Sequence, residues 1–492
     1  MPIMRNFPEL GLSAFRETAW LYVIVVSVVG VGILFSLYAG AHLPPPASAS
    51  PHIAVAQEGV HRADAIRSPS PTILAALAHN ASTGLSRLIL QLAIILSVSS
   101  AMGWTFMRLG QPAVLGEMTA GILLGPSLFG LVAPQAFLFV FAPASLDALR
   151  LFSQIGVCIF MFAVGMELDL SQLRDSAHRF LVIGHSSILI PYLFGVVLAL
   201  FLYNNYAPSA VSFTPFALVV GISMSITAFP VLVRILQDRK LFRSKLGQMA
   251  TLCAAIADVT AWCILAFVVA IAGAANVKAA TFSLLLVGVY VAAMIFIVKP
   301  LLRRLLGQSL LHESEPTKGV LALVFGTVLL SALSTEIIGI HALFGAFLAG
   351  IVMPSGGGFR KKLVLRVEHF SSVLLLPLFF AFIGLRTQIG LLNSSWDWLI
   401  CLVIISVATV GKLGGTSLAS RMMKMSWRDS LKLGALMNTR GLMELIVLNI
   451  GYDLGILSLP IFTMLVLMAI ITTVMTVPLL NLFDDKAVAA TR

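Results

Sequence analysis

Three ionisable residues lie deep inside apolar stretches of this sequence: Asp258, Lys412 and Glu444. Asp258 follows Gly247, the start of its stretch, by 11 residues. That is roughly 16 Å along a helix, or about half the hydrocarbon thickness of a bilayer. Glu444 lies at a similar depth in its own stretch. An ionisable side chain at this depth costs at least about 2.5–3.5 kcal/mol on insertion scales, so it usually has a partner and a function.

A buried carboxylate such as Asp258 can hold either a proton or a monovalent cation, because each neutralises its charge. If the group is exposed alternately to the two sides of a membrane, one ion is exchanged obligatorily for the other. Lys412 is expected to stabilise the empty carboxylate and to be displaced by the bound cation. The alternative is structural: an Asp258–Lys412 ion pair that only holds helices together. Glu444 is open to both interpretations.

Two of the apolar stretches carry residues that weaken a helix near its middle. Ser225 and Thr227 precede Pro230, which removes a backbone donor and disfavours helix in the residue before it. Asn438 and Thr439 weaken the second stretch in the same way. Carbonyls freed at such breaks can bind cations, so we expect these four polar residues to join Asp258 in an ion site. The alternative is a proline kink whose freed groups are satisfied by Ser225 and Thr227.

Glu117 is shallower and lies near one end of the third apolar stretch, the end that the charge pattern places in the cytoplasm. Two interpretations fit this position. Glu117 attracts cations to a cytoplasmic entry, or it caps the start of its helix, where a negative charge is favourable.

The composition defines the elements that must position these residues. The chain has 492 residues, of which 59% are hydrophobic and 11% charged, and its mean hydropathy is +0.99. A soluble domain carries about 25% charged residues. These values exclude a soluble enzyme, a nucleic-acid-binding protein and a disordered scaffold, and they indicate an all-α polytopic protein in a lipid bilayer.

Fourteen apolar stretches have the length of membrane spans. They run roughly over 18–39, 85–107, 113–131, 151–166, 180–203, 214–236, 247–272, 281–298, 319–334, 341–354, 370–385, 398–419, 433–452 and 457–481. With this count, 23 of the 32 basic residues fall on one side of the membrane and 6 on the other. The bias places both termini in the cytoplasm. In this count, residues 319–354 must hold two short spans on either side of Ser334–His341.

The chain divides into a core and additions to it. We expect an additional N-terminal transmembrane helix at 1–40, an exterior Pro/Ala/Ser-rich linker at 41–84, a thirteen-span core at 85–482 and a short cytoplasmic tail at 483–492. The alternative for the first segment is a cleaved signal peptide, because Ala39-Gly40-Ala41 resembles a cleavage site.

Two motifs recur in the two halves of the chain. Gly116–Ile122, ending at Pro126, returns as Gly345–Ile351, ending at Pro354, and Ile159–Met166 is echoed by Leu378–Leu385. On the predicted topology the second copies run in the opposite direction through the membrane. Such an inverted repeat is a recurrent transporter architecture, with the substrate site at the interface of the repeats. The alternative is a chance likeness between helices rich in small residues.

These motifs resemble those of the monovalent cation:proton antiporter family, in the branch of bacterial potassium-efflux and sodium:proton antiporters and plant cation/H+ exchangers. The matching segments are Gln111–Glu117 through Gly125–Ser127, Ser225–Leu232, Ala257–Asp258, Gly411–Lys412, and Met437–Leu442 through Glu444–Val447. The resemblance implies two crossed discontinuous helices beside Asp258, an elevator-like movement of a core domain, and usually a homodimer. One departure is Ala257, where relatives commonly have an acid, Asn or Gln. A single acid favours electroneutral exchange.

We therefore expect a secondary active antiporter that exchanges K+ or Na+ for H+ in a bacterial-type inner membrane, with a role in pH homeostasis. Two alternatives remain: a carrier of another solute on the same scaffold, and a non-transporting membrane sensor or channel-like protein. We expect no enzyme activity, cofactor or nucleic-acid partner, since the sequence shows no nucleophile–base or metal-ligand constellation. The sequence does not choose between K+ and Na+.

Overall fold

The computed structural model describes residues 12–44, 46, 84–167, 177–242, 244–272, 277–312, 317–354 and 359–483. Every regular element in these residues is a helix, and they contain no strand, so the all-α prediction is confirmed. The predicted exterior linker at 41–84 and the tail at 483–492 lie almost wholly outside the described residues.

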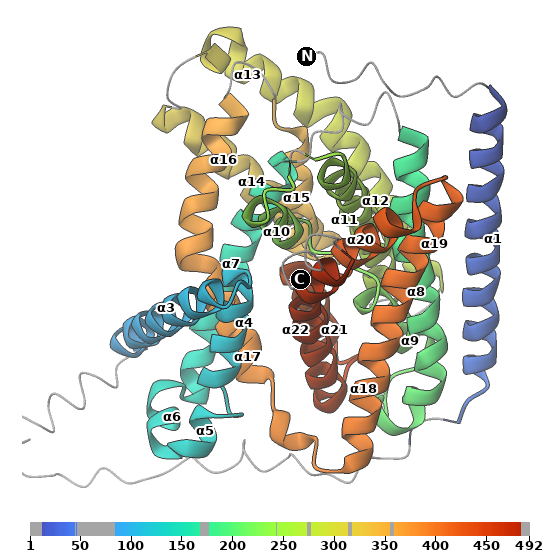
Figure 1. Ribbon diagram of the computed structural model, residues 1–492. Coiled ribbons are helices and arrows are strands. Elements are labelled where there is room, and N and C mark those ends of the chain that lie inside the picture. The colour runs from blue at the N-terminus through green and yellow to red at the C-terminus, as the bar shows by residue number, and fades with distance from the viewer. Residues whose placement is uncertain are drawn as a thin grey trace, which may run out of the picture.

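From α3 onward the helices follow one another with short connections (Figure 1). The first part of the chain holds α1 (Leu12–Ala41), α3 (Gly84–Arg108), α4 (Ala113–Leu124), α5 (Phe129–Val132), α6 (Pro134–Val140), α7 (Pro143–Glu167), α8 (Ala177–Tyr206), α9 (Phe213–Ser223), α10 (Phe229–Asp238) and α11 (Lys245–Ala272). The second part holds α12 (Val277–Ala293), η2 (Met294–Val298), α13 (Lys299–His312), α14 (Lys318–Ile338), α15 (Ala342–Val352), α16 (Phe359–Phe370), η3 (Ser371–Leu375), α17 (Leu376–Arg386), η4 (Ile389–Leu391), α18 (Ser395–Thr409), η5 (Val410–Gly414), α19 (Gly415–Met422), α20 (Trp427–Met437), α21 (Leu442–Asp453) and α22 (Leu459–Leu482).

Among the described residues, 11 helical segments are long and apolar enough to cross a bilayer. Helices also cover the other predicted spans, but in a different form. The stretches 214–236 and 433–452 are each divided into two helices, and the stretch 341–354 holds the short helix α15 of 11 residues. The division between α14 and α15 falls at Gly339, whose φ of 90° ends α14.

Glycines hold together two pairs of helices from opposite halves of the chain. A Cβ built on Gly121 of α4 would collide with the backbone of Phe380 in α17. A Cβ on Gly350 of α15 would likewise collide with the backbone of Phe162 in α7. The helix backbones can approach this closely only because small residues stand at the contacts.

The same two helices, α4 and α15, also pack on the helix that precedes each of them. A Cβ on Gly116 would collide with the Met102 carbonyl of α3, and one on Gly345 with the Ser331 carbonyl of α14. The two copies of the first recurring motif, Gly116–Ile122 and Gly345–Ile351, therefore make similar contacts, each with the helix that precedes it.

The first helix, α1, lies at one edge of the protein and packs against α8 and α9 (Figure 1). Val29 and Ser36 are buried in this contact face, where Gly32 lies against Leu193 of α8. Most of the exposed side chains of α1, including Phe35, are apolar. Such a helix faces lipid over most of its circumference.

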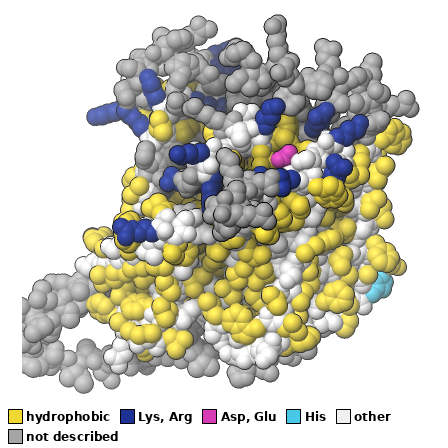
Figure 2. All heavy atoms as spheres, viewed as in Figure 1, with side chains coloured by type: hydrophobic (Ala, Val, Ile, Leu, Met, Phe, Trp, Pro, Cys, Tyr) yellow, Lys and Arg dark blue, Asp and Glu magenta, His cyan; other side chains and the backbone are white. Residues whose placement is uncertain are grey.

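The charged surface is separated from the apolar surface. Most Lys and Arg side chains on the face in Figure 2 gather in its upper part, above a broad band of hydrophobic side chains. This arrangement is typical of a membrane protein whose basic loops lie on one side of the bilayer.

Candidate ion-binding site

Two helix breaks meet inside the protein. Residues 224–228 separate α9 from α10, and residues 438–441 separate α20 from α21. The amide of Ala228 donates to the carbonyl of Thr439 at 2.9 Å. The hydroxyl of Thr227 donates to the last carbonyl of α20 at 3.0 Å. Each break thus satisfies backbone groups that the other leaves without a helical partner.

Local sequence explains both breaks. Pro230 lies in the first turn of α10, where its missing N–H costs no helical hydrogen bond. Gly441 precedes α21, and a Cβ at this position would lie 2.9 Å from a methyl carbon of Val231. Glycine therefore lets the second break approach α10 closely.

Arg440, to which the sequence patterns gave no role, joins the two breaks. Its guanidinium donates to the carbonyls of Ser223 at 2.9 Å and Met224 at 2.5 Å, at the end of α9. The same group lies 3.3 Å from the carboxylate of Glu444, and both side chains are fully buried. A basic residue four positions before an acid inside an apolar stretch is the signal that could have identified this pair.

Glu444 lies in the first turn of α21, the helix end that favours a negative charge. Its Oε2 pairs with Arg440, and its Oε1 accepts no hydrogen bond from the described residues. The hydroxyl of Thr473 accepts from the Arg440 amide at 2.8 Å and donates to the Arg440 carbonyl at 2.9 Å. The Arg440–Glu444 pair is thus tied to α22 as well as to α9.

Lys412 lies in η5, a π-helical turn between α18 and α19, and its side chain is fully buried. The ammonium donates to the carbonyl of Ser187 in α8 at 2.7 Å and to the carbonyl of Ser225 in the first break. These two carbonyls, rather than a carboxylate, are its partners. Asp258 and Lys412 form no direct hydrogen bond within the described structure.

Asp258 lies in the middle of α11 and is fully buried. Neither carboxylate oxygen accepts a hydrogen bond from any residue that the structure describes. Burying a carboxylate without a partner is costly, and a bound proton or cation removes most of that cost.

The other four residues predicted for the ion site all lie in the two breaks and are fully buried. The hydroxyls of Ser225, Thr227 and Thr439 donate to backbone carbonyls at 2.9, 3.0 and 2.7 Å. Asn438 Nδ2 donates to the Thr472 carbonyl at 3.4 Å, while its Oδ1 has no partner among the described residues. A hydroxyl that donates its proton keeps oxygen lone pairs that can bind a cation.

Glu117 lies on α4, outside the two breaks and outside α11, and is half-buried. The helix begins at Ala113, and its first turn contains no acidic residue. Glu117 therefore does not cap the start of α4, and that alternative is wrong.

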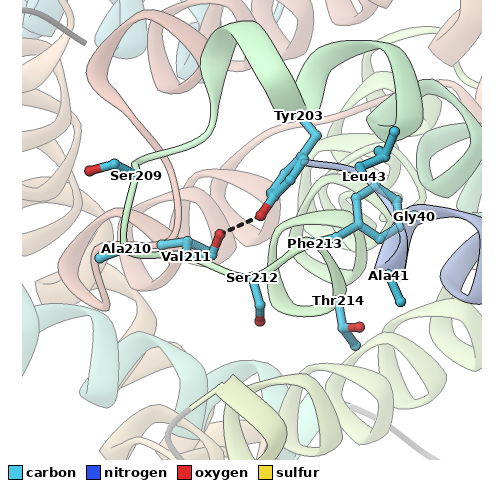
Figure 3. A pocket seen from close by; sticks show the side chains of 10 residues that line it. All are labelled: Gly40, Ala41, Leu43, Tyr203, Ser209, Ala210, Val211, Ser212, Phe213 and Thr214. Atoms are coloured by element: carbon cyan, nitrogen blue, oxygen red, sulfur yellow. Dashed lines mark hydrogen bonds between the residues drawn. The ribbon is translucent and has the colours of Figure 1, made fainter. Parts of the chain in front are cut away.

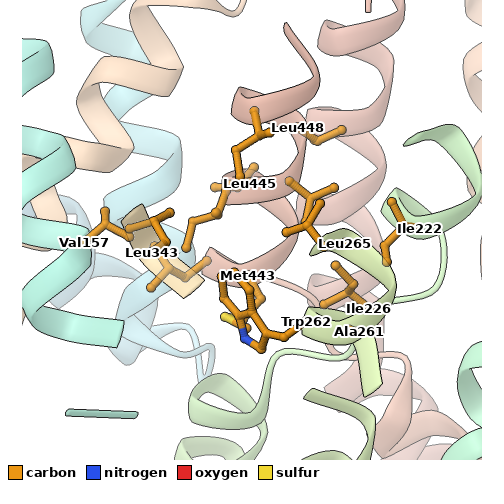
Figure 4. Close-up of a cluster of buried hydrophobic side chains, with 14 of the residues drawn as sticks. Val157, Ile222, Ile226, Ala261, Trp262, Leu265, Leu343, Met443, Leu445 and Leu448 are labelled. Carbon is orange, nitrogen blue, oxygen red and sulfur yellow. The ribbon is translucent and has the colours of Figure 1, made fainter. Parts of the chain in front are cut away.

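The face of α11 that carries Asp258 continues as an apolar surface. Ala261, Trp262 and Leu265 follow at helical spacing and are buried together with Met443 of α21 (Figure 4). The carboxylate is therefore bordered by an apolar cluster on this side.

A cavity of about 410 Å³ lies between the end of α1 and the connection from α8 to α9 (Figure 3). Its lining includes Gly40, Phe213 and Tyr203, whose hydroxyl donates to the Val211 carbonyl at 2.7 Å. None of the predicted ion-site residues lines it. The cavity therefore belongs to the contact of α1 and not to the polar cluster.

Comparison with known proteins agrees with the resemblance seen in the motifs. The chain is 40% identical over 387 residues to the Na(+)/H(+) antiporter NhaS4 of Synechocystis sp. (strain ATCC 27184 / PCC 6803 / Kazusa), over 78% of this chain and 94% of that protein. It is 40% identical to Cation/H(+) antiporter 17 of Arabidopsis thaliana, over 80% of this chain and 48% of that protein. It is 32% identical to K(+)/H(+) antiporter 1 of Saccharomyces cerevisiae, over 82% of this chain and 47% of that protein. The chain thus spans about half the length of the plant and yeast relatives.

A solved structure shows the same fold. The sodium proton antiporter MjNhaP1 from Methanocaldococcus jannaschii has a TM-score of 0.58 at 16% identity, over 81% of this chain and 96% of that one. The family model described as "Sodium/hydrogen exchanger, transmembrane" matches residues 93–482. Since this match runs from within α3 to the end of α22, the chain belongs to the sodium/hydrogen exchanger family, whose members are transporters rather than enzymes.

Proposed function

We propose that this protein exchanges a monovalent cation, K+ or Na+, for H+ across the cell membrane, and that Asp258 binds both. The observation that carries the proposal is the Asp258 carboxylate, buried without a hydrogen-bond donor among the described residues. A bare carboxylate is unstable in such a place and is neutralised by a proton or a cation. The names of the relatives, which include Na(+)/H(+) and K(+)/H(+) antiporters, support this choice of ions.

A single acid accounts for one-for-one, electroneutral exchange. The Arg440–Glu444 pair is neutral as a unit, and Lys412 contributes one positive charge. Adding either H+ or a monovalent cation to Asp258 gives the same net charge, so the two loaded forms cross the membrane with equal charge. Ala257, directly before Asp258, offers no second acid for another ion.

Lys412 stabilises the empty carboxylate in this mechanism. Its charge acts on Asp258 through space, which lowers the cost of losing one ion before the next one binds. Because the ammonium is bonded to the carbonyls of Ser187 and Ser225, it leaves the carboxylate oxygens open to the transported ion.

The polar groups of the breaks complete the proposed site. Ser225, Thr227, Asn438 and Thr439 offer hydroxyl, amide and freed carbonyl oxygens, the kind of ligand that discontinuous helices supply to alkali cations. Glu117, on α4, is proposed to attract cations at the cytoplasmic entry.

Alternating access is proposed to arise from an inverted repeat in a thirteen-span core that follows α1. The equivalent packing of α4 and α15 supports the repeat, as does the meeting of one break from each half. Both termini are proposed to lie in the cytoplasm, on the basic side of the protein. We propose a homodimer as the assembled form.

Ion-driven proton flux tests the proposal. The purified full chain is reconstituted in liposomes with an imposed pH gradient and a fluorescent pH reporter, and Na+, K+, Li+ and choline are added in turn. We expect Na+ or K+ to dissipate the gradient in wild type and in Asp429→Asn, a matched change on the exposed surface of α20. Asp258→Asn is expected to abolish the response. Clamping the membrane voltage with an ionophore is expected to leave the rate unchanged.

Other outcomes assign other functions. Competition by organic solutes would indicate a carrier of another substrate on this scaffold. If wild type transports neither the cations nor an organic solute, the protein is a non-transporting sensor. If Asp258→Asn exchanges ions as fast as wild type, Asp258 has a structural role only.

A further inference from the structure

The interior of α8 contains a proline, Pro191. In a regular helix the amide of residue 191 would donate to the Ser187 carbonyl, but proline has no N–H. That carbonyl accepts the Lys412 ammonium at 2.7 Å instead. The Ser187 hydroxyl does not replace the missing donor, because it donates to the Gly184 carbonyl at 2.7 Å. The proline thus leaves an acceptor inside the membrane that a lysine from another helix fills.

A second interior proline, Pro478 in α22, gives an independent example of the same arrangement. Its helical partner would be the carbonyl of Val474. That carbonyl accepts from Gln111 Nε2, from the segment before α4, at 3.4 Å. In both helices a side chain from a distant segment takes the place of the absent amide.

Glycines allow the turn that carries Lys412 to lie against α8 at this point. A Cβ on Gly411 would be 3.1 Å from the Phe194 ring and 3.2 Å from Pro191. A Cβ on Gly415 would be 3.0 Å from Ile190. The close approach lets the ammonium reach the Ser187 carbonyl from η5.

We propose that Pro191 is a positioning residue for ion exchange: it leaves the Ser187 carbonyl free to anchor the Lys412 ammonium, so that the ammonium does not occupy the carboxylate of Asp258. The inference rests on the proposed function of Asp258. An ammonium with two carbonyl partners has most of its donors satisfied. Without the Ser187 carbonyl, the lysine turns to the carboxylate, and a direct pair competes with the incoming cation.

Pro191→Ala tests the proposal because it supplies the missing amide to the Ser187 carbonyl. We expect the apparent KM for the transported cation, measured for Na+ and K+ in liposomes, to rise roughly tenfold, which corresponds to about 1.4 kcal/mol. The maximal rate is expected to change less than about twofold, since the transported form is unaltered once the cation has bound. Pro478→Ala is the matched control: it also adds an amide to a buried helix but leaves the Lys412 contact intact, and its KM should equal that of wild type. Pro191→Gly supplies the same amide and replaces the alanine variant if that variant folds poorly.

A second measurement separates anchoring of Lys412 from a general effect of the proline on helix shape. Pro191→Ala is combined with Lys412→Gln, and binding is read as protection from thermal unfolding by Na+ or K+ relative to choline. We expect the proline change to have no further effect there, because no ammonium remains to be released. An equal loss of cation affinity in both backgrounds, or an unchanged KM in Pro191→Ala, would overturn the role of Pro191. Either result leaves the Asp258→Asn comparison, and therefore the proposed function, intact.

Discussion

Replacing Arg440 with methionine should destabilise the junction of the two helix breaks more than any single loss of charge beside it. Arg440→Met removes two hydrogen bonds, to the Ser223 and Met224 carbonyls, and the ion pair with Glu444. Breaking one partner out of a buried ion pair costs about 3–5 kcal/mol. Each buried carbonyl left without a donor costs about 1–3 kcal/mol. These costs overlap, so we expect the free energy of unfolding to fall by about 4 kcal/mol or more.

Replacing the neighbouring acid, Glu444, should lower the free energy of unfolding less than replacing Arg440 does. Glu444→Gln removes the negative charge but keeps an oxygen that can accept from Arg440, and Arg440 keeps both carbonyls. We expect a loss of about 1–3 kcal/mol. The double variant Arg440→Met, Glu444→Gln should be more stable than Arg440→Met alone, because it no longer buries an unpaired carboxylate.

Equilibrium unfolding in detergent, followed by the fluorescence of the six tryptophans, measures these differences. Arg421→Met, which removes an exposed guanidinium from α19, is the matched control and should stay within about 1 kcal/mol of wild type. The reasoning is refuted if Arg440→Met behaves like this control, or if the double variant is less stable than Arg440→Met.

Three further predictions concern packing and hydrogen bonds around the site. Gly384→Ala drives a Cβ into the backbone of α4 and should lower the melting temperature sharply, whereas Gly288→Ala, which meets open space, should not; thermal melts that show equal effects would contradict the close contact. Thr473→Val removes both hydrogen bonds to the Arg440 backbone and should reduce the free energy of unfolding by about 1–3 kcal/mol, measured by the same fluorescence assay. Asp453→Asn breaks a partly exposed ion pair of 2.7 Å with α17 and should cost only about 1 kcal/mol, less at high salt, so a large salt-independent loss would argue against this assignment.

The residues that indicated a candidate site from the sequence are those whose chemistry conflicts with their surroundings. Burying the charged side chains of Asp258 and Lys412 in apolar stretches costs free energy, and Pro230 lacks the N–H that would continue a preceding helix through it. Each of these conflicts is local, so the sequence could place the charged residues and both helix breaks. Glycine-rich motifs in the same order in both halves likewise marked helices that pack closely on one another, while the inverted repeat itself stays a prediction.

The partners of these residues could not be predicted, because they depend on contacts between distant segments. The Ser187 carbonyl is 225 positions from Lys412, and the Met224 carbonyl is 216 positions from Arg440. A backbone carbonyl carries no sequence signal of its own, so nothing marked these two as acceptors. The Asp258–Lys412 pair could not be judged from the sequence for the same reason. Opposite charges at similar depth suggested a direct contact, but the Lys412 ammonium donates to two backbone carbonyls instead.

The position of α1 determines which helix faces meet lipid at one edge of the protein. The helix packs on α8 and α9, while residues 42–83 connect it to α3. Fully extended, a segment of 42 residues could reach roughly 140 Å, several times the thickness of a bilayer, so the number of residues alone does not fix where α1 lies relative to α3. Because α1 packs on α8 and α9 at one edge of the protein, lipid on that side contacts α1 instead of the faces of α8 and α9 that α1 covers.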